Sequence, residues 1–307
     1  MVIRMNRSKF ISDGKSDKNK SRLIKSVTAG LSGLSSFETK PKGVFGSVAR
    51  IIYNGAVFDS DEFDIEFSVK FDDDMEANEA EITIYNLKDS TINQFKHKYA
   101  ISIEAGYEGD TGVIFQGFVT KVYTSRSGAD KVISIQCIDR VVSRTVEEIT
   151  YSAGTKASYI LRDLLNRTGT PIAVFKMRND HTFENDEKVD GDLMAAIKKY
   201  SDICGVSTYI NKGKIYSRHI KEGDNISFTI KTDTGLIGSP QYFEEEKTEE
   251  DFKETIKGYE CEILLQHRIS AGVIVNLTSE FANGQYRVCS GEHTFNISEA
   301  ITKLKMY

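Results

Sequence analysis

Five histidines and one run of carboxylates are the residues of this sequence best suited to proton transfer or metal binding. The histidines are His97, His181, His219, His267 and His293. None belongs to an HExxH pair, which would hold zinc on one face of a helix. His293 follows Glu292 near the end of a predicted strand and is the best candidate for a general base. Since the sequence places no nucleophile or metal partner beside it, we interpret His293 as a structural, hydrogen-bonded histidine.

The carboxylate run consists of Asp72, Asp73 and Asp74, followed by Glu76 and Glu79. Its composition resembles a calcium-binding loop, because carboxylate oxygens are the ligands that Ca²⁺ prefers. The run lacks the D-x-D-x-D-G order and the glutamate at the twelfth position of such loops. Runs of like charge usually face water. We therefore predict a solvated turn between two strands.

The remaining sequence motifs offer no catalytic centre. The chain contains no GxSxG, P-loop or GxGxxG motif, and its many carboxylates do not by themselves indicate a glycosidase pair. The cysteines Cys137, Cys204, Cys261 and Cys289 are far apart and form no CxxC spacing, which argues against zinc. They are typical of small hydrophobic residues in a reducing compartment. We predict no catalytic, cofactor-binding or metal-binding residues, and no enzyme activity.

Charge is distributed unevenly along the chain. Residues 1–43 contain ten Lys and Arg but only three Asp and Glu, whereas the whole chain has a formal charge of −5. This basic, Ser-rich extension predicts an arm that docks on an acidic surface, or equally a solvated, unfolded terminus. Clustered Lys and Arg could also contact nucleic acid, but the acidic remainder argues against specific nucleic-acid binding.

Residues 44–150 carry the pattern of a β-rich domain. In Phe63–Asp72 apolar and polar residues alternate, as expected for a half-buried strand. The same reading applies to Glu79–Leu87, Ala100–Tyr107, Gly112–Arg126 and Asp130–Asp139, with a helical turn after Leu87 capped by Asp89 or Ser90. Short strands at regular spacing predict a closed or nearly closed barrel.

The pattern changes in residues 151–225 and returns to strands in residues 226–307. Apolar stripes of helical period occur at 155–169, where Thr155 is the predicted N-cap, and at 190–205. A short strand, 171–177, lies between these helices, and a hairpin, 206–218, follows them. We therefore predict a small α+β domain. Strands are predicted at Ile226–Asp233, Tyr259–Gln266, Gly272–Ser279 and Gly284–Phe295. The acidic segment Phe243–Gly258 is predicted to be a loop or a frayed helix. The expected fold class is α+β, mainly β.

No targeting signal is evident. The first residues lack the apolar core of a signal peptide, and no apolar run reaches the roughly 18 residues of a membrane span. We therefore expect a soluble protein made in the cytoplasm, without a membrane anchor.

Several stretches, taken in order, resemble the baseplate hub proteins of long-tailed phages and related contractile particles, also called late-control proteins. The stretches are AEITIYNL (Ala80–Leu87), ISIEAGYEGDTGVIFQGFVTKV (Ile101–Val122), ADKVISIQCID (Ala129–Asp139), Lys156–Ile172, Gly191–Tyr216, Thr234–Gln241, Tyr259–Leu277 and Gly284–Thr294. The chain departs from the family pattern in its N-terminal extension. Its last residues, ISEAITKLKMY, lack the W-x-T-x-l motif expected at this end. It also has no fused hydrolase.

This resemblance implies a domain division and a set of partners. Two tail-tube-like β-barrel domains, 44–150 and 226–307, would flank the α+β domain 151–225 and follow the extension 1–43. Three chains would offer six barrels around a channel, so that a homotrimer joins a hexameric tail tube to a trimeric spike. Implied partners are the tail tube or tube-initiator protein, the central spike, and also tape measure and baseplate wedge proteins. DNA would pass through the channel of a contractile tail, and the protein would be located in the virion baseplate after assembly in the host cytoplasm.

Two other functions stay open at this point. One is a tail-associated peptidoglycan hydrolase, which would need an acid/base pair that no segment supplies visibly. The other is cell-wall binding by residues 151–220, which have the size and two-helix content of small wall-binding domains. A tube or sheath subunit is a third alternative, but it would need only one barrel.

Overall fold

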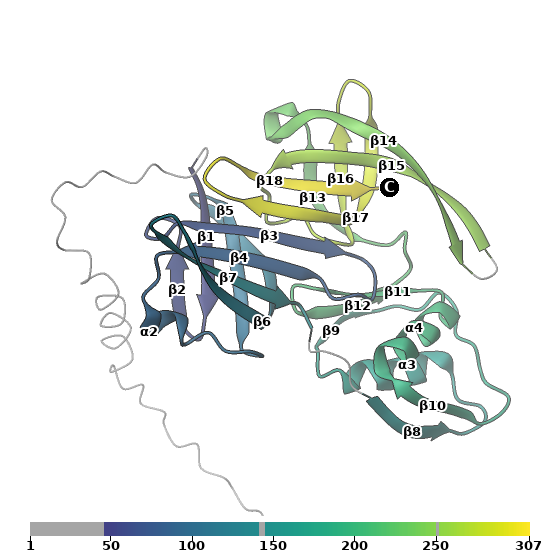
Figure 1. The fold of residues 1–307 in the computed structure, drawn as a ribbon. Helices are drawn as coiled ribbons and strands as arrows, with labels where there is room; N and C mark the ends of the chain where they lie inside the picture. Colours follow the sequence, from purple (N-terminus) through teal and green to yellow (C-terminus); the bar gives the residue numbers. More distant parts are fainter. Residues whose placement is uncertain (1–45, 141–144, 250–251) are drawn as a thin grey trace, which may run out of the picture. The chain divides into compact units, whose positions relative to one another are not determined.

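A computed structural model describes residues 46–140, 145–249 and 252–307 of the chain. Most of these residues lie in strands, and the two longer helices belong to the middle of the chain (Figure 1). The predicted class, α+β and mainly β, is confirmed. The basic extension 1–43 lies outside the described residues, so its docking stays a prediction.

The first β region begins with a strand pair and contains β6, the longest of the described strands. Its strands alternate buried and solvent-facing residues, as the sequence predicts. The elements are β1 (Ser47–Tyr53), β2 (Ala56–Asp59), β3 (Ile65–Asp72), β4 (Glu79–Tyr85), helix α2 (Asp89–Ile92), β5 (Ala100–Tyr107), β6 (Asp110–Ser127) and β7 (Asp130–Ile138). Strands β6 and β7 form the predicted hairpin around Gly128, whose positive φ of 61° suits glycine.

The middle module contains two small sheets and two helices. Its apolar stripes on α3 and α4 meet in one buried cluster, which confirms the predicted helices. The elements are β8 (Thr145–Tyr151), α3 (Ala157–Arg167), β9 (Ile172–Phe175), β10 (Glu187–Asp192), α4 (Leu193–Ile203), β11 (Ser207–Asn211) and β12 (Lys214–Arg218). Strand β8 pairs with β10, so the module includes residues before position 151. Asp192 caps α4 by accepting a hydrogen bond from the Ala195 amide.

The last third is almost entirely strand. It contains β13 (Asp224–Ile230), a short 3-10 turn η2 (Thr232–Thr234), β14 (Leu236–Glu249), β15 (Phe252–Leu264), β16 (Val273–Thr278), β17 (Asn283–Phe295) and β18 (Ala300–Met306). The end of the chain, whose pairing the sequence did not indicate, is the strand β18, which lies between β15 and β17.

Both β regions belong to one sheet. Its hydrogen-bonded order is β14-β15-β18-β17-β3-β4-β7-β6-β5-β1-β2, with β16 and β13 attached beside β17. The link between the regions is the antiparallel pair β17–β3, which joins Phe295 to Phe67 and Ser290 to Asp72. Within the described residues this order is an open path, so the expected closed barrel is not found in the hydrogen bonding.

Three local predictions were wrong. The acidic segment Phe243–Gly258 is not a loop or a helix but belongs to the two strands of the β14–β15 hairpin. Cross-strand contacts, such as the Tyr242 and Tyr259 rings and the Lys257–Glu244 ion pair of 3.2 Å, override its helix-forming composition.

The two predicted helix caps were also wrong. Lys88 and Lys156 occupy the N-cap positions of α2 and α3, without a side-chain cap. Asp89 instead pairs with Lys131, and the Thr155 hydroxyl donates to the Ser152 carbonyl. These competing partners take the side chains away from the helix amides.

Three buried apolar clusters fill the described residues. One lies inside the first β region, one in the last third and one in the middle module. The domain boundaries at 43, 150 and 225 stay a prediction. Over the described ranges, no helix has both the length and the apolar character needed to cross a membrane.

Candidate functional site

A polar face extends across the sheet from β14 to β6. On β3, Ile65, Phe67, Val69 and Phe71 are buried, while the alternate side chains point to the opposite face. The neighbouring strands keep the same alternation because their register aligns polar with polar positions. The charged residues of this polar face are Glu66, Lys70, Asp72, Glu79, Glu81, Lys121, Glu260, Glu262, Glu292, Lys303 and Lys305. Carboxylates outnumber lysines, so the face is mildly acidic.

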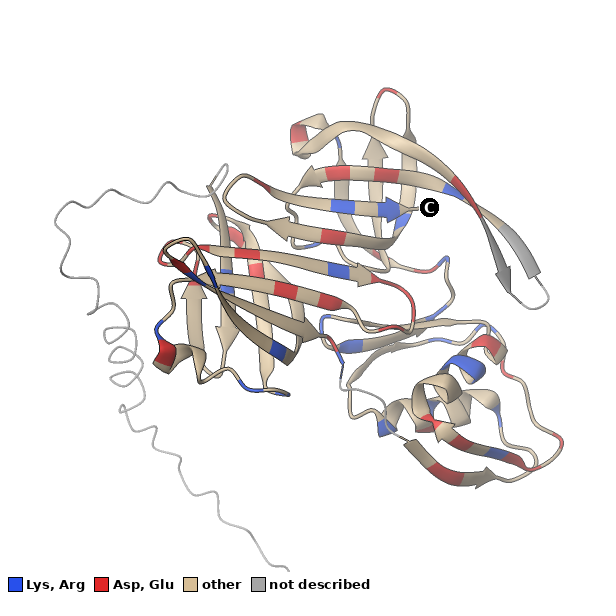
Figure 2. Cartoon of the chain, in the orientation of Figure 1, with Lys and Arg blue, Asp and Glu red and all other residues tan. Residues whose placement is uncertain are grey.

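Opposite charges alternate in one row across five strands of this face. Residues that pair directly from strand to strand are Glu262, Lys303, Glu292, Lys70 and, by continuation of the register, Glu79. Figure 2 shows the red and blue positions that alternate across β15, β18, β17, β3 and β4. Each exposed pair contributes little, since the Lys303–Glu262 separation is 3.9 Å and water screens it. Their main effect is to favour this register across the junction of the two β regions.

A shallow groove of about 580 Å³ runs along the polar face over β14, β15, β18 and β17. Small residues are among those that line it, namely Gly238, Ser239, Ser290 and Gly291. A Cβ atom at Gly291 would lie 2.3 Å from the Lys303 carbonyl oxygen, so only glycine fits there. The groove is lined by charged side chains of both signs and is therefore suited to a hydrated, polar occupant.

A buried joint connects the three parts of the chain behind the polar face. Arg287 of β17 forms an ion pair with Asp73, in the loop between β3 and β4, and both side chains are nearly inaccessible to solvent. The Arg287 Nε donates to the Glu222 carbonyl at 2.8 Å, and its Nη1 donates to the Tyr307 hydroxyl at 3.0 Å. Ser207 of β11 donates to the Asp73 carbonyl at 2.6 Å. The prediction that the Asp72–Asp74 run is a solvated turn was therefore wrong for Asp73.

A second arginine strengthens the same joint. Arg218, at the end of β12, donates to the Tyr209 hydroxyl at 2.7 Å and to the Gly272 carbonyl at 2.9 Å. It also pairs with Asp224 at 3.0 Å. The bonds to Gly272 and Asp224 hold the middle module against the last third of the chain, and the bond to Tyr209 fixes the arginine within the module. Because the arginine is 96 % buried, each bond is made in a low-dielectric setting.

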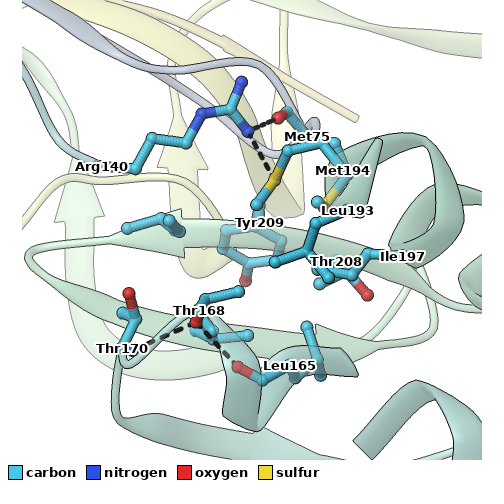
Figure 3. A pocket seen from close by; sticks show the side chains of 12 residues that line it. Met75, Arg140, Leu165, Thr168, Thr170, Leu193, Met194, Ile197, Thr208 and Tyr209 are labelled. Atoms are coloured by element: carbon cyan, nitrogen blue, oxygen red, sulfur yellow. Dashed lines mark hydrogen bonds between the residues drawn. The ribbon is translucent and has the colours of Figure 1, made fainter. Parts of the chain in front are cut away.

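The first β region is attached to the middle module by a different contact. The amide and side chain of Asn78 donate to the Asp139 carboxylate at 3.1 and 2.7 Å, and Asn78 also donates to the Ile210 carbonyl at 3.2 Å. Arg140 donates to the Met75 carbonyl and contacts the Met194 sulfur at 3.4 Å (Figure 3). The cavity beside these residues measures about 20 Å³, which holds one water rather than a ligand.

Two carboxyl groups beside these contacts, Asp72 and Asp139, have pKa values shifted towards neutral pH. Burial and the neighbouring Asp74 and Asp73 carboxylates raise the pKa of Asp72 to about 7, and burial raises the pKa of Asp139 to about 6. In the unfolded chain both pKa values are close to 3.9. The folded protein thus binds more protons, and its stability, complete below about pH 4, falls as the pH rises through 6 and 7.

Asp72→Asn should therefore stabilise the protein at pH 8 and change little at pH 4. We expect up to about 1 kcal/mol at pH 8, since Asp72 is only partly shielded from water. Urea unfolding at both pH values measures the difference, and Glu76→Gln, on the same loop but exposed, is the control. Equal stability of Asp72→Asn and the unmodified chain at pH 8 would show that ionisation of the Asp72 carboxyl does not destabilise the folded protein.

His293 lies in the core of the last third rather than at a surface. It is fully buried; its Nε2 donates to the Ile269 carbonyl at 3.2 Å, and its Nδ1 lies 2.8 Å from the Thr302 hydroxyl. Burial lowers the pKa of His293 to about 3, so the ring is neutral. Both ring nitrogens are engaged inside the protein, which is the geometry of a structural histidine. Glu292 points to the other face of the strand, as the alternation of β17 requires.

The cysteines and the carboxylates do not gather into a metal centre in the part of the chain that the structure describes. Cys137, Cys204, Cys261 and Cys289 are free and buried, and burial raises the pKa of Cys137 and Cys261 to about 12. They pack as small hydrophobic residues, as predicted. Sequence reasoning missed the joint, because neither Arg287 nor Arg218 stands in a recognisable motif.

We compared the chain with protein families, with curated proteins and with solved structures. A family model described as baseplate hub gp41 matches residues 79–299. No curated protein matches the chain. The fold is similar to that of the 43 kDa tail protein of prophage MuSo2 from Shewanella oneidensis, at 8 % identity and a TM-score of 0.58, over 85 % of this chain and 97 % of that one.

Two further structures have similar scores. The tail protein from Neisseria meningitidis MC58 has 8 % identity and a TM-score of 0.58, with 85 % of this chain and 96 % of that chain covered. The E. coli c3393 protein has 10 % identity and a TM-score of 0.58, with 80 % and 73 % covered. It is described as a type VI secretion component with structural similarity to the bacteriophage T4 tail proteins gp27 and gp5. At these identities the likeness concerns the fold alone.

Proposed function

Because the chain belongs to the baseplate hub gp41 family, and thus has a structural role in a phage-type tail or baseplate, we propose that it is the trimeric hub of that baseplate. Three chains form a ring that joins the hexameric tail tube to a trimeric spike. The protein acts mechanically and not as an enzyme. It is made in the host cytoplasm and resides in the virion baseplate.

One observation carries this proposal: the chain joins two β regions edge to edge into a single sheet through the antiparallel pair of β17 and β3. Each region has its own buried apolar cluster. Three such chains present six β regions, which matches a six-fold tube on one side and a three-fold spike on the other. The buried joint suits a part under mechanical load, since the Arg287–Asp73 ion pair, the arginine hydrogen bonds to backbone carbonyls and the Ser207 hydroxyl tie all three parts of the chain together.

The polar face is the surface that we assign to the channel. It is continuous across both β regions and carries alternating charges with an excess of carboxylates. An acidic lining repels the phosphate backbone, so DNA passes without binding. The particle that we propose is a contractile tail, as the sequence resemblance implies.

The test is electron microscopy of the purified chain in negative stain, alone and mixed with a candidate spike, with native mass spectrometry in parallel. We expect a three-chain ring with six lobes and a central hole. A chain that stays monomeric, even with spike and tube protein present, would overturn the proposal. Wall-binding and hydrolase assays would then test the alternatives.

A further inference from the structure

A cleft of about 360 Å³ lies between the β14–β15 hairpin and the rest of the chain. Lys257 of β15 lines one side of this hairpin cleft. The other side is lined by Gln285 and Arg287 of β17, by Lys221 of the loop after β12 and by Tyr307. The volume lies in the range of ligand-binding sites, which is about 300–1,000 Å³. The hairpin cleft is therefore large enough to hold a few groups of a binding partner.

The hairpin cleft lies on the core side of the sheet, at the point where the core ends. Cys261 and Ile263 of β15 are buried in the apolar cluster of the last third. Since side chains alternate along a strand, Thr255 and Lys257 lie on the same side of β15 as these two residues. Strand β18 pairs with β15 only as far as Tyr259, so beyond this residue the described hairpin consists of two strands. The polar face lies on the other side of β15.

Apolar side chains form part of the hairpin cleft and of the surface beside it. Tyr286, Ile256 and Ile274 line the cleft. The centroid of the Tyr259 ring lies 5.8 Å from that of Tyr242 and 5.5 Å from that of Tyr286, both in edge-to-face contact. Tyr242 is 57 % exposed, so the outer end of this row is open to water. An apolar side chain of a partner would be buried favourably here.

The lining of the hairpin cleft is basic, although the chain as a whole is acidic. Lys221, Lys257 and Arg287 line it and no described Asp or Glu does, whereas the whole chain has a formal charge of −5. Lys257 pairs with Glu244 at 3.2 Å, but both side chains are about half exposed, and pairs of this kind contribute little. Lys257 can therefore exchange this partner for another carboxylate.

Arg287 adds a buried donor to the wall of the hairpin cleft. Its Nε and Nη1 bind the Glu222 carbonyl, the Asp73 carboxylate and the Tyr307 hydroxyl. Its Nη2 is buried and has no hydrogen-bond partner in the part of the chain that the structure describes. Buried donors without a partner are rare. An acceptor that enters the cleft would supply one, directly or through a water.

We propose that the hairpin cleft binds an extended segment of another baseplate protein, one that presents a carboxylate group beside an apolar side chain. The carboxylate pairs with Lys221 and Lys257, and the apolar side chain packs on Tyr286. Gln285 offers a donor and an acceptor to the backbone of the segment. The inference rests on the proposed function only for the source of the segment, since the binding itself needs no ring.

A model peptide tests this chemistry on the purified full chain. The probe is a fluorescein-labelled peptide of alternating Leu and Glu, and the comparison peptide has Gln in place of Glu. Fluorescence anisotropy should show saturable binding of the Glu peptide, and binding weaker by about tenfold or more for the Gln peptide. Equal affinities for the two peptides, or no binding of the Glu peptide at about 1 mM, would overturn the inference. Either result leaves the hub proposal standing.

Two pairs of substitutions show whether the peptide occupies the hairpin cleft. Lys221→Glu with Lys257→Glu should weaken binding of the Glu peptide by about tenfold or more, because it places like charges at the contact. Lys188→Glu with Lys198→Glu, two exposed lysines of the middle module, is the charge-matched control and should bind like the unmodified chain. Circular dichroism checks that each variant folds. A folded cleft variant that binds like the control would refute the site.

Cross-linking in the assembled baseplate identifies the source of the segment and requires no substitution. A carbodiimide joins a lysine amine directly to a nearby carboxylate, and mass spectrometry identifies the linked peptides. We expect links from Lys221 or Lys257 to an Asp or Glu of a different baseplate protein. Links only to carboxylates of this chain, such as the neighbouring Glu244, would overturn the assignment to another protein.

Discussion

We expect Arg287→Leu to lower the free energy of unfolding by about 3–5 kcal/mol, the largest single effect in the chain, because it leaves a buried carboxylate without its partner. Arg287 is 4 % exposed, and the Asp73 side chain that it pairs with is 10 % exposed. The substitution also removes donors from the Glu222 carbonyl and the Tyr307 hydroxyl. Chemical denaturation of the purified chain measures the loss.

Two controls separate the charge effect from lost packing. Arg268→Leu breaks the exposed pair with Asp110, 2.6 Å apart, and should cost less than about 1 kcal/mol. The double variant Asp73→Asn with Arg287→Leu should regain part of the stability lost in Arg287→Leu, because the unpaired charge is gone. A loss for Arg287→Leu no larger than that for Arg268→Leu would contradict a structural role of the buried pair.

Gly272→Ala is the second substitution for which we expect a large effect, about 2–4 kcal/mol of unfolding free energy. Gly272 has a φ of 77°, and a Cβ atom there would lie 1.9 Å from the Tyr209 hydroxyl oxygen and 2.5 Å from Arg218 Nη2. The methyl group would therefore displace the Tyr209 and Arg218 side chains, and with them the hydrogen bond from Arg218 to the Gly272 carbonyl that holds the middle module against the last third. Thermal and urea unfolding both report this loss.

Gly128→Ala is the matched control for backbone strain. Gly128 also has a positive φ, 61°, but no atom lies within 4 Å of the added Cβ, so we expect only about 1 kcal/mol. In the Gly272→Ala background, Tyr209→Phe should recover part of the loss by removing the hydroxyl oxygen from the clash, a coupling that a double-mutant cycle measures. Equal losses for the two glycine variants, without recovery by Tyr209→Phe, would refute the steric account.

Periodicity made the individual elements predictable. Alternation placed β3, β5 and β7 within two residues of their observed bounds, and helical stripes placed α3 and α4. It failed at Phe243–Gly258, because charged residues that favour a helix in isolation were paired across β14 and β15 instead. Pairing of this kind depends on a partner strand and cannot be seen in one segment.

The candidate site was less accessible to sequence reasoning than the strands. The solvent-facing positions of β3 and β4 were predictable, and the family resemblance, carried by ordered motifs, was confirmed by the family match. The row from Glu262 to Glu79 was not predictable, since it requires the register of β17 on β3, whose paired residues Glu292 and Lys70 are separated by over two hundred positions in the chain.

The amino-acid sequence by itself determined the fold class, the order of strands and helices along the chain, and membership of a hub family, because hydrophobic period and motif order are local properties. Only the tertiary structure decided that the two β regions share one open sheet, and that Asp73 is a buried ion-pair partner rather than part of a solvated turn. The reason is physical: sheet register and charge burial depend on contacts between distant segments, where packing outweighs the local preference of any single residue.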